Sequence, residues 1–308
     1  MLDLHKLTIF AAVVRAGSFS GAAEELLMTQ PAVSQHMQEL EASLGARLFQ
    51  RGRRGVSLTP AGQKLAEYTQ AIFRLVSEAE NAVTDVANLH SGQIAVGATP
   101  GVSVYLLPEP VQEFQSRYPN LAVQVQTGIT PQIVDALLRT RLDLGLIEGE
   151  LDDAIHPAIG VQLLQEVDQL LVVGRKHPWW GLASVEMQAL NGQTFIMRQR
   201  SSQTRIWLDD VLMRAQVRPK IGAEFDNVES IKRAVANGAG VTVLPEYAVR
   251  TEREMDVLWT VSVADQPLQR TLKLVWNRET LFSPAVRAFL AHLQRPFPAI
   301  DVGAICAV

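Results

Sequence analysis

The stretch from Ser18 to Arg54 constrains the fold most, because it carries start and stop signals for two short helices. Ser20 is placed to cap the first helix. Thr29 is placed to cap the second, and Pro31 is tolerated in its first turn, where the N–H that proline lacks would have no partner. Gly45 marks the end of the second helix. Helical spacing also predicts one buried stripe on this helix, made of Val33, Met37, Leu40 and Leu44.

The opposite face of the second helix carries short, uncharged hydrogen-bonding side chains near its N-terminus, namely Gln30, Ser34, Gln35 and Gln38. A recognition helix needs such groups to reach base edges in a major groove, and a glutamine can bond adenine through two hydrogen bonds. The alternative is a helix face that simply meets solvent. The pattern therefore leaves two interpretations, a DNA-reading helix-turn-helix and an ordinary solvated helix.

A segregated basic patch favours the first interpretation. From residue 42 to residue 66 there is no acidic residue, and the 5 basic ones are Arg47, Arg51, Arg53, Arg54 and Lys64. The whole chain has a net charge of −4, so the patch departs from the overall balance. Phosphate contacts need such a patch, whereas a merely soluble surface intersperses the two signs. The predicted DNA-binding residues are Ser20, Thr29, Gln30, Pro31, Ser34, Gln35, Gln38, Arg51, Arg53 and Arg54.

Residues 55–62 are mostly short side chains between two glycines, and they predict a small hairpin, or wing. Thr59 and Pro60 then indicate the start of a long helix. Between Lys64 and Leu89 the chain has no glycine or proline. Two heptad positions carry apolar or small side chains, namely Leu65, Ile72, Ala79 and Val86, and Tyr68, Leu75, Ala82 and Leu89. This helix either packs on its own domain or pairs with a second copy. The four matching repeats favour a homodimer through residues 63–90, which would place two recognition helices on two half-sites.

Length and composition fit two or three globular domains, with 308 residues of which 47% are hydrophobic and 19% charged. No apolar run approaches the ~18 residues of a membrane span. Leu7 to Val14 predicts an amphipathic helix and not a signal peptide, because Asp3 precedes it and Arg15 interrupts it. We therefore expect a cytoplasmic chain with no membrane partner. The lone Cys306 excludes an intramolecular disulfide, and six scattered histidines predict neither a metal site nor a cofactor.

Strands and helices alternate after a hinge at Ser91 and Gly92. The expected strands are residues 94–98, 121–125, 144–147, 170–173, 195–197, 221–225, 241–244 and 272–275. The expected helices are residues 104–118, 130–138, 206–212, 228–236 and 283–293. This order implies parallel sheets with right-handed crossovers. We expect subdomain I at residues 91–165 plus 268–308 and subdomain II at residues 166–267, with the chain crossing near 161–168 and 265–271.

Polar residues follow the carboxyl ends of these strands, where open parallel sheets bind ligands. The predicted effector-binding residues are Thr99, Pro100, Gly101, Thr130, Glu148, Arg200, Ser201, Ser202 and Asn227. Helix N-termini bind anions, and a cation from Arg198, Arg200 or Arg205 would add charge. The favoured interpretation is a small anionic metabolite between the subdomains. The alternative is that each Ser, Thr or Asn only caps its helix.

The chain resembles the LysR-type transcriptional regulators over essentially its whole length. The spacings that carry the resemblance are Ser18-Phe-Ser, Ala22-Ala23-Glu24, Gln30-Pro31-Ala32-Val33-Ser34, Leu40-Glu41, Leu44-Gly45, Leu48-Phe49-Gln50-Arg51 and Leu58-Thr59-Pro60-Ala61-Gly62. The resemblance implies an α/β protein with an N-terminal winged helix-turn-helix at 1–62, a linker helix at 63–90, and a two-subdomain periplasmic-binding-protein-like (type 2) effector domain at 91–308. It also implies homotetramers that act on double-stranded DNA and RNA polymerase.

Carried over to this chain, the resemblance implies that Gln30, Pro31, Ser34 and Gln35 face DNA and that Arg53 lies near the minor groove. Thr99, Thr130, Ser201 and Ser202 would line the effector site. Two positions depart from the family pattern. Residues 201–205 read Ser-Ser-Gln-Thr-Arg where many members have Gly-Ser-Gly-Thr-Arg, and Gln35 stands where many have Arg. The paired cysteines of the peroxide-sensing branch are absent.

Two other function classes fit less well. We find no nucleophile elbow, phosphate loop or Rossmann glycine fingerprint, so we expect no catalytic residues and no enzyme. A solute-binding protein would explain only the last two-thirds of the chain, because such a protein has no use for the basic helix-turn-helix. The prediction is a regulator whose effector shifts the population of two assemblies and so changes transcription.

Overall fold

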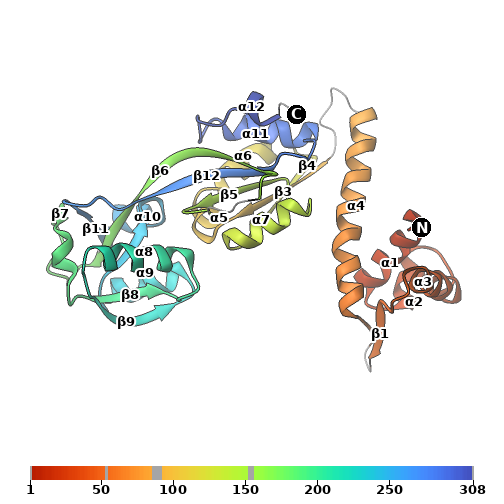
Figure 1. Ribbon diagram of the computed structural model, residues 1–308, viewed down its shortest axis with the longest axis horizontal. Coiled ribbons are helices and arrows are strands. Elements are labelled where there is room, and N and C mark those ends of the chain that lie inside the picture. Colours follow the sequence, from red (N-terminus) through yellow and green to blue (C-terminus); the bar gives the residue numbers. More distant parts are fainter. Residues whose placement is uncertain (1, 53–54, 85–91, 152–155, 307–308) are drawn as a thin grey trace. The chain divides into compact units, whose positions relative to one another are not determined.

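The computed structural model describes residues 2–52, 55–84, 92–151 and 156–306, and the chain divides into two compact units, Met1–Thr84 and Asp85–Val308. The first unit, red and orange in Figure 1, is helical apart from one hairpin. The second unit, yellow to blue, alternates strands and helices. This is the change of pattern that the sequence predicts after residue 90.

The N-terminal unit packs three short helices against a hairpin and the start of a long helix. Its elements are α1 (Leu4–Ala16), α2 (Phe19–Glu25), α3 (Gln30–Leu44), β1 (Phe49–Gly52), β2 (Gly55–Leu58) and α4 (Pro60–Thr84). Its core contains the buried side chains of Phe10, Ala22, Val33 and Met37. The Phe49 ring from the hairpin joins this core, with its centroid 5.3 Å from that of Phe10. The predicted helix-turn-helix is therefore present as α2 and α3.

The first cap prediction is wrong. Ser18, not Ser20, caps α2: the Ser18 Oγ accepts a hydrogen bond from the Gly21 N–H at 3.0 Å, and Ser20 lies exposed within the helix. Both serines suit a cap by residue type. What selects Ser18 is Gly17, which ends α1 with φ at 65° and sets where the next helix begins.

The second helix follows its signals more closely. Thr29 is the N-cap of α3, although its hydroxyl makes no cap hydrogen bond, and Gly45 ends the helix with φ at 64°. Three members of the predicted buried stripe are buried, but Leu44 is 40% exposed. It stands in the last turn of α3, beyond the reach of the core that α1 and α2 make, so periodicity alone overstated the stripe.

The Thr59 side chain links the hairpin to the long helix. The Thr59 hydroxyl donates to the Arg47 carbonyl at 2.6 Å and accepts from the Gly62 N–H at 3.0 Å. The backbone comes so close here that a Cβ at Gly62 would lie 2.0 Å from the Leu48 carbonyl oxygen. β1 and β2 pair antiparallel, from Phe49 opposite Leu58 to Gly52 opposite Gly55. The predicted wing and the helix start at Pro60 are thus confirmed.

The long helix α4 carries much of the predicted heptad pattern. Tyr68 and Leu75 are 46% and 45% exposed, so this face is not used within the unit. Leu65, by contrast, packs against the core of α1–α3. Val86 and Leu89, the last members of the two heptad rows, lie outside the described residues.

The second unit is built on a mixed sheet. Its strands are β3 (Gly92–Ala98), β4 (Leu121–Thr127), β5 (Leu144–Glu148), β6 (Ile159–Gly174), β7 (Ser184–Val185), β8 (Thr194–Arg198), β9 (Lys220–Phe225), β10 (Thr242–Pro245), β11 (Leu258–Val263) and β12 (Gln269–Asn277). The main sheet has the order β4-β3-β5-β12-β6-β11-β7, with β10 also pairing β6. β4, β3 and β5 are parallel, as predicted, whereas β12 runs antiparallel to both β5 and β6.

Helices cover these strands. They are α5 (Pro100–Tyr105), α6 (Pro108–Arg117), α7 (Thr130–Leu138), α8 (Gln203–Arg214), α9 (Val228–Ala236), α10 (Arg250–Glu254), α11 (Pro284–Leu293) and α12 (Val302–Cys306), with 3-10 turns η1 (Met187–Leu190) and η2 (Glu246–Ala248). The single helix expected at 104–118 is wrong: Pro108 and Pro110 lack the N–H groups a continuous helix needs, so α5 and α6 are separate.

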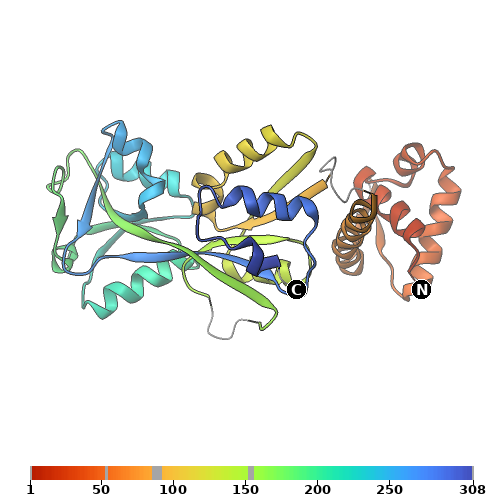
Figure 2. The ribbon, with the colours of Figure 1, turned by 90° about the horizontal axis from the view of Figure 1, so that it is seen from above.

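Two long strands connect the halves of this unit. The strand expected at 170–173 is the end of the 16-residue β6, which pairs with β12 from Ile159 opposite Asn277 to Asp168 opposite Gln269. Figure 2 shows these strands, green and blue, running side by side from one group of helices to the other. The segments expected as crossings therefore lie in or next to a continuous ladder. Separate buried clusters lie on each side, around Phe114 and Phe289 and around Phe195. The exact subdomain boundaries stay a prediction.

Candidate DNA interface and effector site

The exposed face of α3 carries the polar side chains predicted to meet DNA. Gln30, Pro31, Gln35 and Gln38 are exposed, and Ser34 is half-buried. The Gln35 amide donates to Glu39 at 3.1 Å, and Glu39 forms an ion pair of 2.9 Å with Lys6 on α1. These two contacts lower the pKa of the Glu39 carboxyl, the Lys6 contact first. Gln35 is thereby oriented by its own helix.

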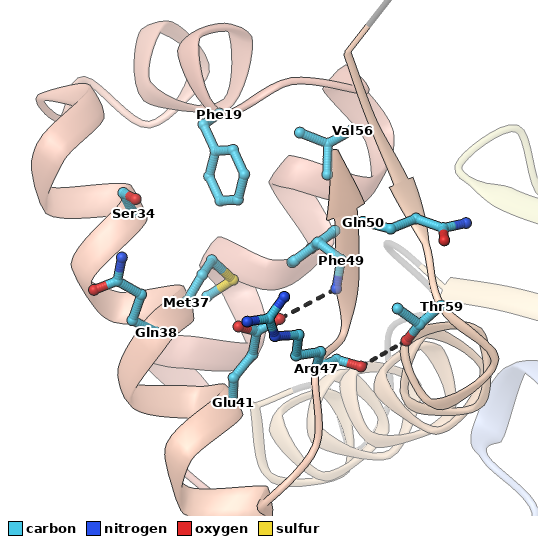
Figure 3. A pocket seen from close by; sticks show the side chains of 10 residues that line it. All are labelled: Phe19, Ser34, Met37, Gln38, Glu41, Arg47, Phe49, Gln50, Val56 and Thr59. Carbon is cyan, nitrogen blue, oxygen red and sulfur yellow. Dashed lines mark hydrogen bonds between the residues drawn. The ribbon is translucent and has the colours of Figure 1, made fainter. Parts of the chain in front are cut away.

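Part of this face borders a pocket of about 690 Å³ between α3 and the hairpin. Figure 3 shows Ser34 and Gln38 on α3 across from Gln50 on β1, with Arg47 below them. The helical pattern of α3 did not predict that Gln50 and Arg47 lie beside this face. The basic run from Arg47 to Lys64 was the available signal for Arg47.

The other predicted DNA-binding residues are placed less completely. Ser20 lies exposed on α2, and Thr29 is exposed at the start of α3. Arg51 belongs to β1, which the hairpin pairing places beside β2. Arg53 and Arg54 lie outside the described residues.

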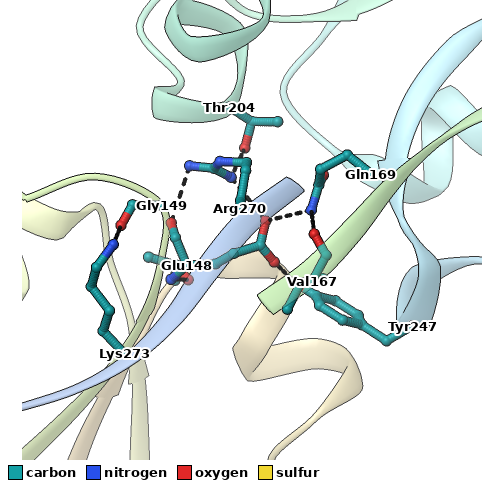
Figure 4. A network of polar contacts seen from close by, with 9 residues as sticks. Glu148, Gly149, Val167, Gln169, Thr204, Tyr247, Arg270 and Lys273 are labelled. Carbon is teal, nitrogen blue, oxygen red and sulfur yellow. Dashed lines mark hydrogen bonds and ion pairs between the residues drawn. The ribbon is translucent and has the colours of Figure 1, made fainter. Parts of the chain in front are cut away.

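The second candidate site is at the boundary between the two halves of the C-terminal unit, around Glu148. The Glu148 carboxylate is buried: its Oε1 accepts from Arg270 Nη1 at 2.9 Å and from Gln169 Nε2 at 3.1 Å, and the Tyr247 hydroxyl donates to its Oε2. Figure 4 shows these groups converging from β5, β6, β12 and η2. The backbone N–H of Glu148 also donates to Thr99 Oγ1 at 3.2 Å.

Arg270 extends this network to α8. Its Nη1 donates to Thr204 Oγ1 at 3.1 Å, its Nη2 donates to the Glu148 carbonyl at 3.1 Å, and its guanidinium lies 5.5 Å from the Trp207 ring centroid. The sequence offered no signal for Arg270, because a basic residue inside a strand belongs to no motif. Its ion pair with Glu148, 3% and 5% exposed, is a buried charge pair whose disruption leaves an uncompensated charge.

Seven of the nine predicted effector residues fall into three groups. Thr99, Pro100, Gly101 and Glu148 lie together; a Cβ at Gly101 would be 2.7 Å from the Tyr247 hydroxyl. Thr130 and Ser202 are buried at helix starts, and their hydroxyls make no hydrogen bond within the described part of the chain. Ser201 is exposed.

Asn227 is held by a cap. It is exposed at the start of α9, and its side chain accepts from the Glu229 N–H at 2.7 Å, as the helix-cap alternative expects. At this position the capping interpretation describes the contact that the structure has.

The three arginines named as possible cations differ sharply. Arg200 is 85% exposed and lies 3.7 Å from Glu224. Arg205 is buried, with ion pairs to Asp209 and Glu224 at 2.8 and 3.0 Å. Arg198 is half-buried and donates to the Asp226 carbonyl at 2.5 Å, and burial lowers the pKa of its guanidinium. Of these three arginines, Arg198 is the half-buried one that makes no ion pair within 4 Å among the described residues.

A second polar bridge lies nearby. The Tyr105 hydroxyl on α5 donates to Glu229 on α9 at 2.5 Å, and Lys232 Nζ lies 5.0 Å from the Tyr105 ring centroid. Burial first, and then the Glu229 contact, raises the pKa of Tyr105. The Tyr105 and Tyr247 rings are 6.0 Å apart, so the two bridges adjoin.

Within the described ranges, no three His, Cys, Asp or Glu side chains are grouped so that they could hold a metal ion. The helices described there include none with the length and hydropathy of a membrane span.

Comparison with known proteins places both units in one family. A family model described as bacterial regulatory helix-turn-helix protein, lysR family, matches residues 4–63, and one described as LysR substrate binding domain matches residues 87–297. The chain belongs to the LysR family of transcriptional regulators. Similar curated relatives are the probable RuBisCO transcriptional regulators of Nostoc sp., 33% identical over 97% of this chain and 89% of the relative, and of Synechocystis sp., 32% identical over 96% and 86%.

Solved LysR-type structures share the fold. Full-length CbnR complexed with its target DNA aligns with a TM-score of 0.72 at 21% identity, covering 96% of this chain and 99% of that one. A full-length variant of OxyR from Pseudomonas aeruginosa aligns with a TM-score of 0.70 at 22% identity, covering 96% and 95%. The predicted winged helix-turn-helix, the periplasmic-binding-protein-like domain and the role as a DNA-binding regulator, not an enzyme, are confirmed.

Proposed function

We propose that this LysR-type regulator reads its operator with the exposed face of α3 and the hairpin beside it. Gln30, Ser34, Gln35 and Gln38 would meet base edges, and Arg51, Arg53 and Arg54 would meet the backbone and minor groove. The observation that supports this is the row of uncharged donors and acceptors on α3 beside a basic hairpin. The partner is double-stranded DNA, and the regulator acts in the cytoplasm.

Substitution of Gln30 tests this proposal. Gln30→Ala should weaken binding to the selected operator by about 1–3 kcal/mol if the side chain makes a two-bond base contact, and far less on random duplex. The operator is first selected from a random-sequence duplex pool with the full-length protein. Gln112→Ala, at an exposed glutamine of α6, is the matched control and should bind as the parent does. Equal losses on operator and random DNA would contradict base reading by Gln30.

We further propose that α4 pairs two copies and that dimers assemble into tetramers. The exposed Tyr68 and Leu75 support this, because exposed apolar side chains at heptad spacing gain stability only by pairing. Effector binding would then change the arrangement of the DNA-binding units, the bend of the promoter and the contact with RNA polymerase.

The proposed effector is a small anion bound between the two halves of the C-terminal unit. Supporting this are polar contacts that cross the boundary: Arg270 reaches Thr204, and Tyr247 reaches Glu148. A ligand seated there must favour one arrangement of these contacts over another, which is what a population shift requires. Thr99, Thr130 and Ser202 would supply hydroxyls, and Arg198 the charge.

A thermal-shift screen of the full-length protein tests the effector. Carboxylates, sulfate and phosphate are the panel, and an anion at about 100 times its dissociation constant should stabilise by about 2.7 kcal/mol. Arg198→Gln should abolish that shift, whereas Arg200→Gln, which removes the same charge from an exposed side chain, should preserve it. A shift that survives Arg198→Gln but not Arg200→Gln would contradict this assignment.

A further inference from the structure

The pocket between α3 and the hairpin is walled by both elements that the proposed function brings to DNA. Ser34, Met37, Gln38 and Glu41 come from α3, and Phe49, Gln50 and Val56 come from the hairpin. If α3 lies in a major groove and the hairpin tip in the adjacent minor groove, one sugar-phosphate strand must pass between them, because that strand separates the two grooves. The pocket is the space this strand would occupy.

Part of the pocket wall is aromatic and packed on the core. Phe19 and Phe49 are packed edge to face with centroids 5.6 Å apart, and Phe49 is anchored on Phe10 of the core. A deoxyribose ring is largely apolar on its faces and can rest on such a surface. On the α3 side the pocket carries the neutral hydrogen-bonding groups of Ser34 and Gln38 (Figure 3), and Gln50 of β1 also lines it.

Charge distinguishes a phosphate from other occupants. The exposed Arg47 guanidinium has no ion pair within 4 Å among the described residues, and its backbone, not its side chain, holds Thr59. The Glu41 carboxylate also lines the pocket, and its Oε1 is held against the hairpin backbone, where it accepts from the Leu48 and Phe49 N–H groups at 2.6 and 3.2 Å. Arg47, which makes no ion pair within 4 Å among the described residues, is therefore the cation of this pocket that can turn to an incoming phosphate.

We propose that this pocket seats one backbone phosphate and its deoxyribose, with Arg47 as the phosphate contact. This proposal rests on DNA binding by α3 and the hairpin. It predicts that Arg47 strengthens DNA binding without any preference for base sequence.

The salt dependence of DNA binding tests the proposal. For Arg47→Gln in the full-length protein, the slope of log K against log salt should fall by about 0.9, and binding should weaken by roughly 10-fold on selected and random duplexes alike. Arg47→Lys should keep the slope. Arg15→Gln removes a charge from the same unit, but from an arginine already paired with Glu25, and should leave the slope nearly unchanged. Circular dichroism confirms that each variant is folded.

Phosphate ethylation interference locates the contact. In the parent protein, ethylation of one phosphate between the bases read by α3 and the minor groove should block binding, and that interference should disappear in Arg47→Gln. An unchanged salt slope, or interference that persists in the variant, would overturn the assignment to Arg47. Failure of the parent protein to bind any duplex would instead contradict the proposed reading of DNA by α3, so the two failures are distinguishable.

Discussion

At the scale of single residues, the turn between α2 and α3 contains one strained backbone position. Leu27 joins α2 to α3 with φ at 54°, the left-handed region, and is 95% exposed. A leucine there meets a steric penalty of about 1 kcal/mol and gains nothing from burial. The position is tolerated because the turn geometry is imposed by the helices that it connects.

Leu27→Asn should therefore stabilise the N-terminal unit by about 0.5–1 kcal/mol, because asparagine visits the left-handed region more readily. Hydrogen exchange of the α3 amides in the full-length protein without DNA measures this change. Leu2→Asn is the control, since Leu2 is 45% exposed and lies outside the helix-turn-helix. Equal stabilisation by both substitutions would point to lost exposed hydrophobicity as the cause and not to relieved strain.

At the scale of elements, the orientation of the wing depends on one hydroxyl. Thr59 bonds both the Arg47 carbonyl before β1 and the Gly62 N–H at the start of α4. The hairpin is thus tied to the long helix at its base, and a change there should alter the angle that the hairpin takes in the proposed DNA complex.

Thr59→Val keeps the shape and removes both hydrogen bonds. It should destabilise the N-terminal unit by about 1–2 kcal/mol and weaken binding to selected and random DNA together. Denaturant unfolding, followed through hydrogen exchange of the α3 amides, measures the stability. Titration with duplex DNA measures the binding. Thr8→Val removes only an exposed bond to the Leu4 carbonyl within α1 and should change either by less than about 0.5 kcal/mol. A Thr59→Val protein as stable as the parent would show that these two hydrogen bonds do not stabilise the N-terminal unit.

At the scale of the whole molecule, Tyr247 links stability to pH. Burial first, and then the Glu148 carboxylate, raises its pKa well above the ordinary value. The folded unit thus holds the phenolic proton more tightly than the unfolded chain does. The contribution to stability is full below the unfolded pKa of about 10 and is lost as pH rises through the higher folded pKa.

Tyr247→Phe should lower the free energy of unfolding of the C-terminal unit at pH 7 by about 1–3 kcal/mol, because Glu148 Oε2 loses its donor. The loss of stability above pH 10 should become shallower by the contribution of one proton. Unfolding at several pH values measures both effects. Tyr118→Phe, whose hydroxyl has no hydrogen-bond partner within the described residues, should change neither. A parallel pH profile in Tyr247→Phe and the parent would contradict the role of this phenol.

The sequence by itself determined what depends on local signals and period. Pro31, Gly45 and Pro60 set helix ends, short apolar runs set β3 and β5, an alternating run set β4, and the motif spacings identified the family. These features are decided within a few residues, so they can be predicted without knowing what packs where.

Only the tertiary structure decided which polar residues meet. Arg270 and Tyr247 are about 120 and 100 positions from Glu148, yet both bond its carboxylate, because β12, η2 and β5 converge. The same holds for which of Arg198, Arg200 and Arg205 are buried or paired, for the capping of α2 by Ser18 and not by Ser20, and for the place of Arg47 at a pocket. Each depends on burial and on partners supplied by distant segments, and none is encoded in the spacing of neighbours along the chain.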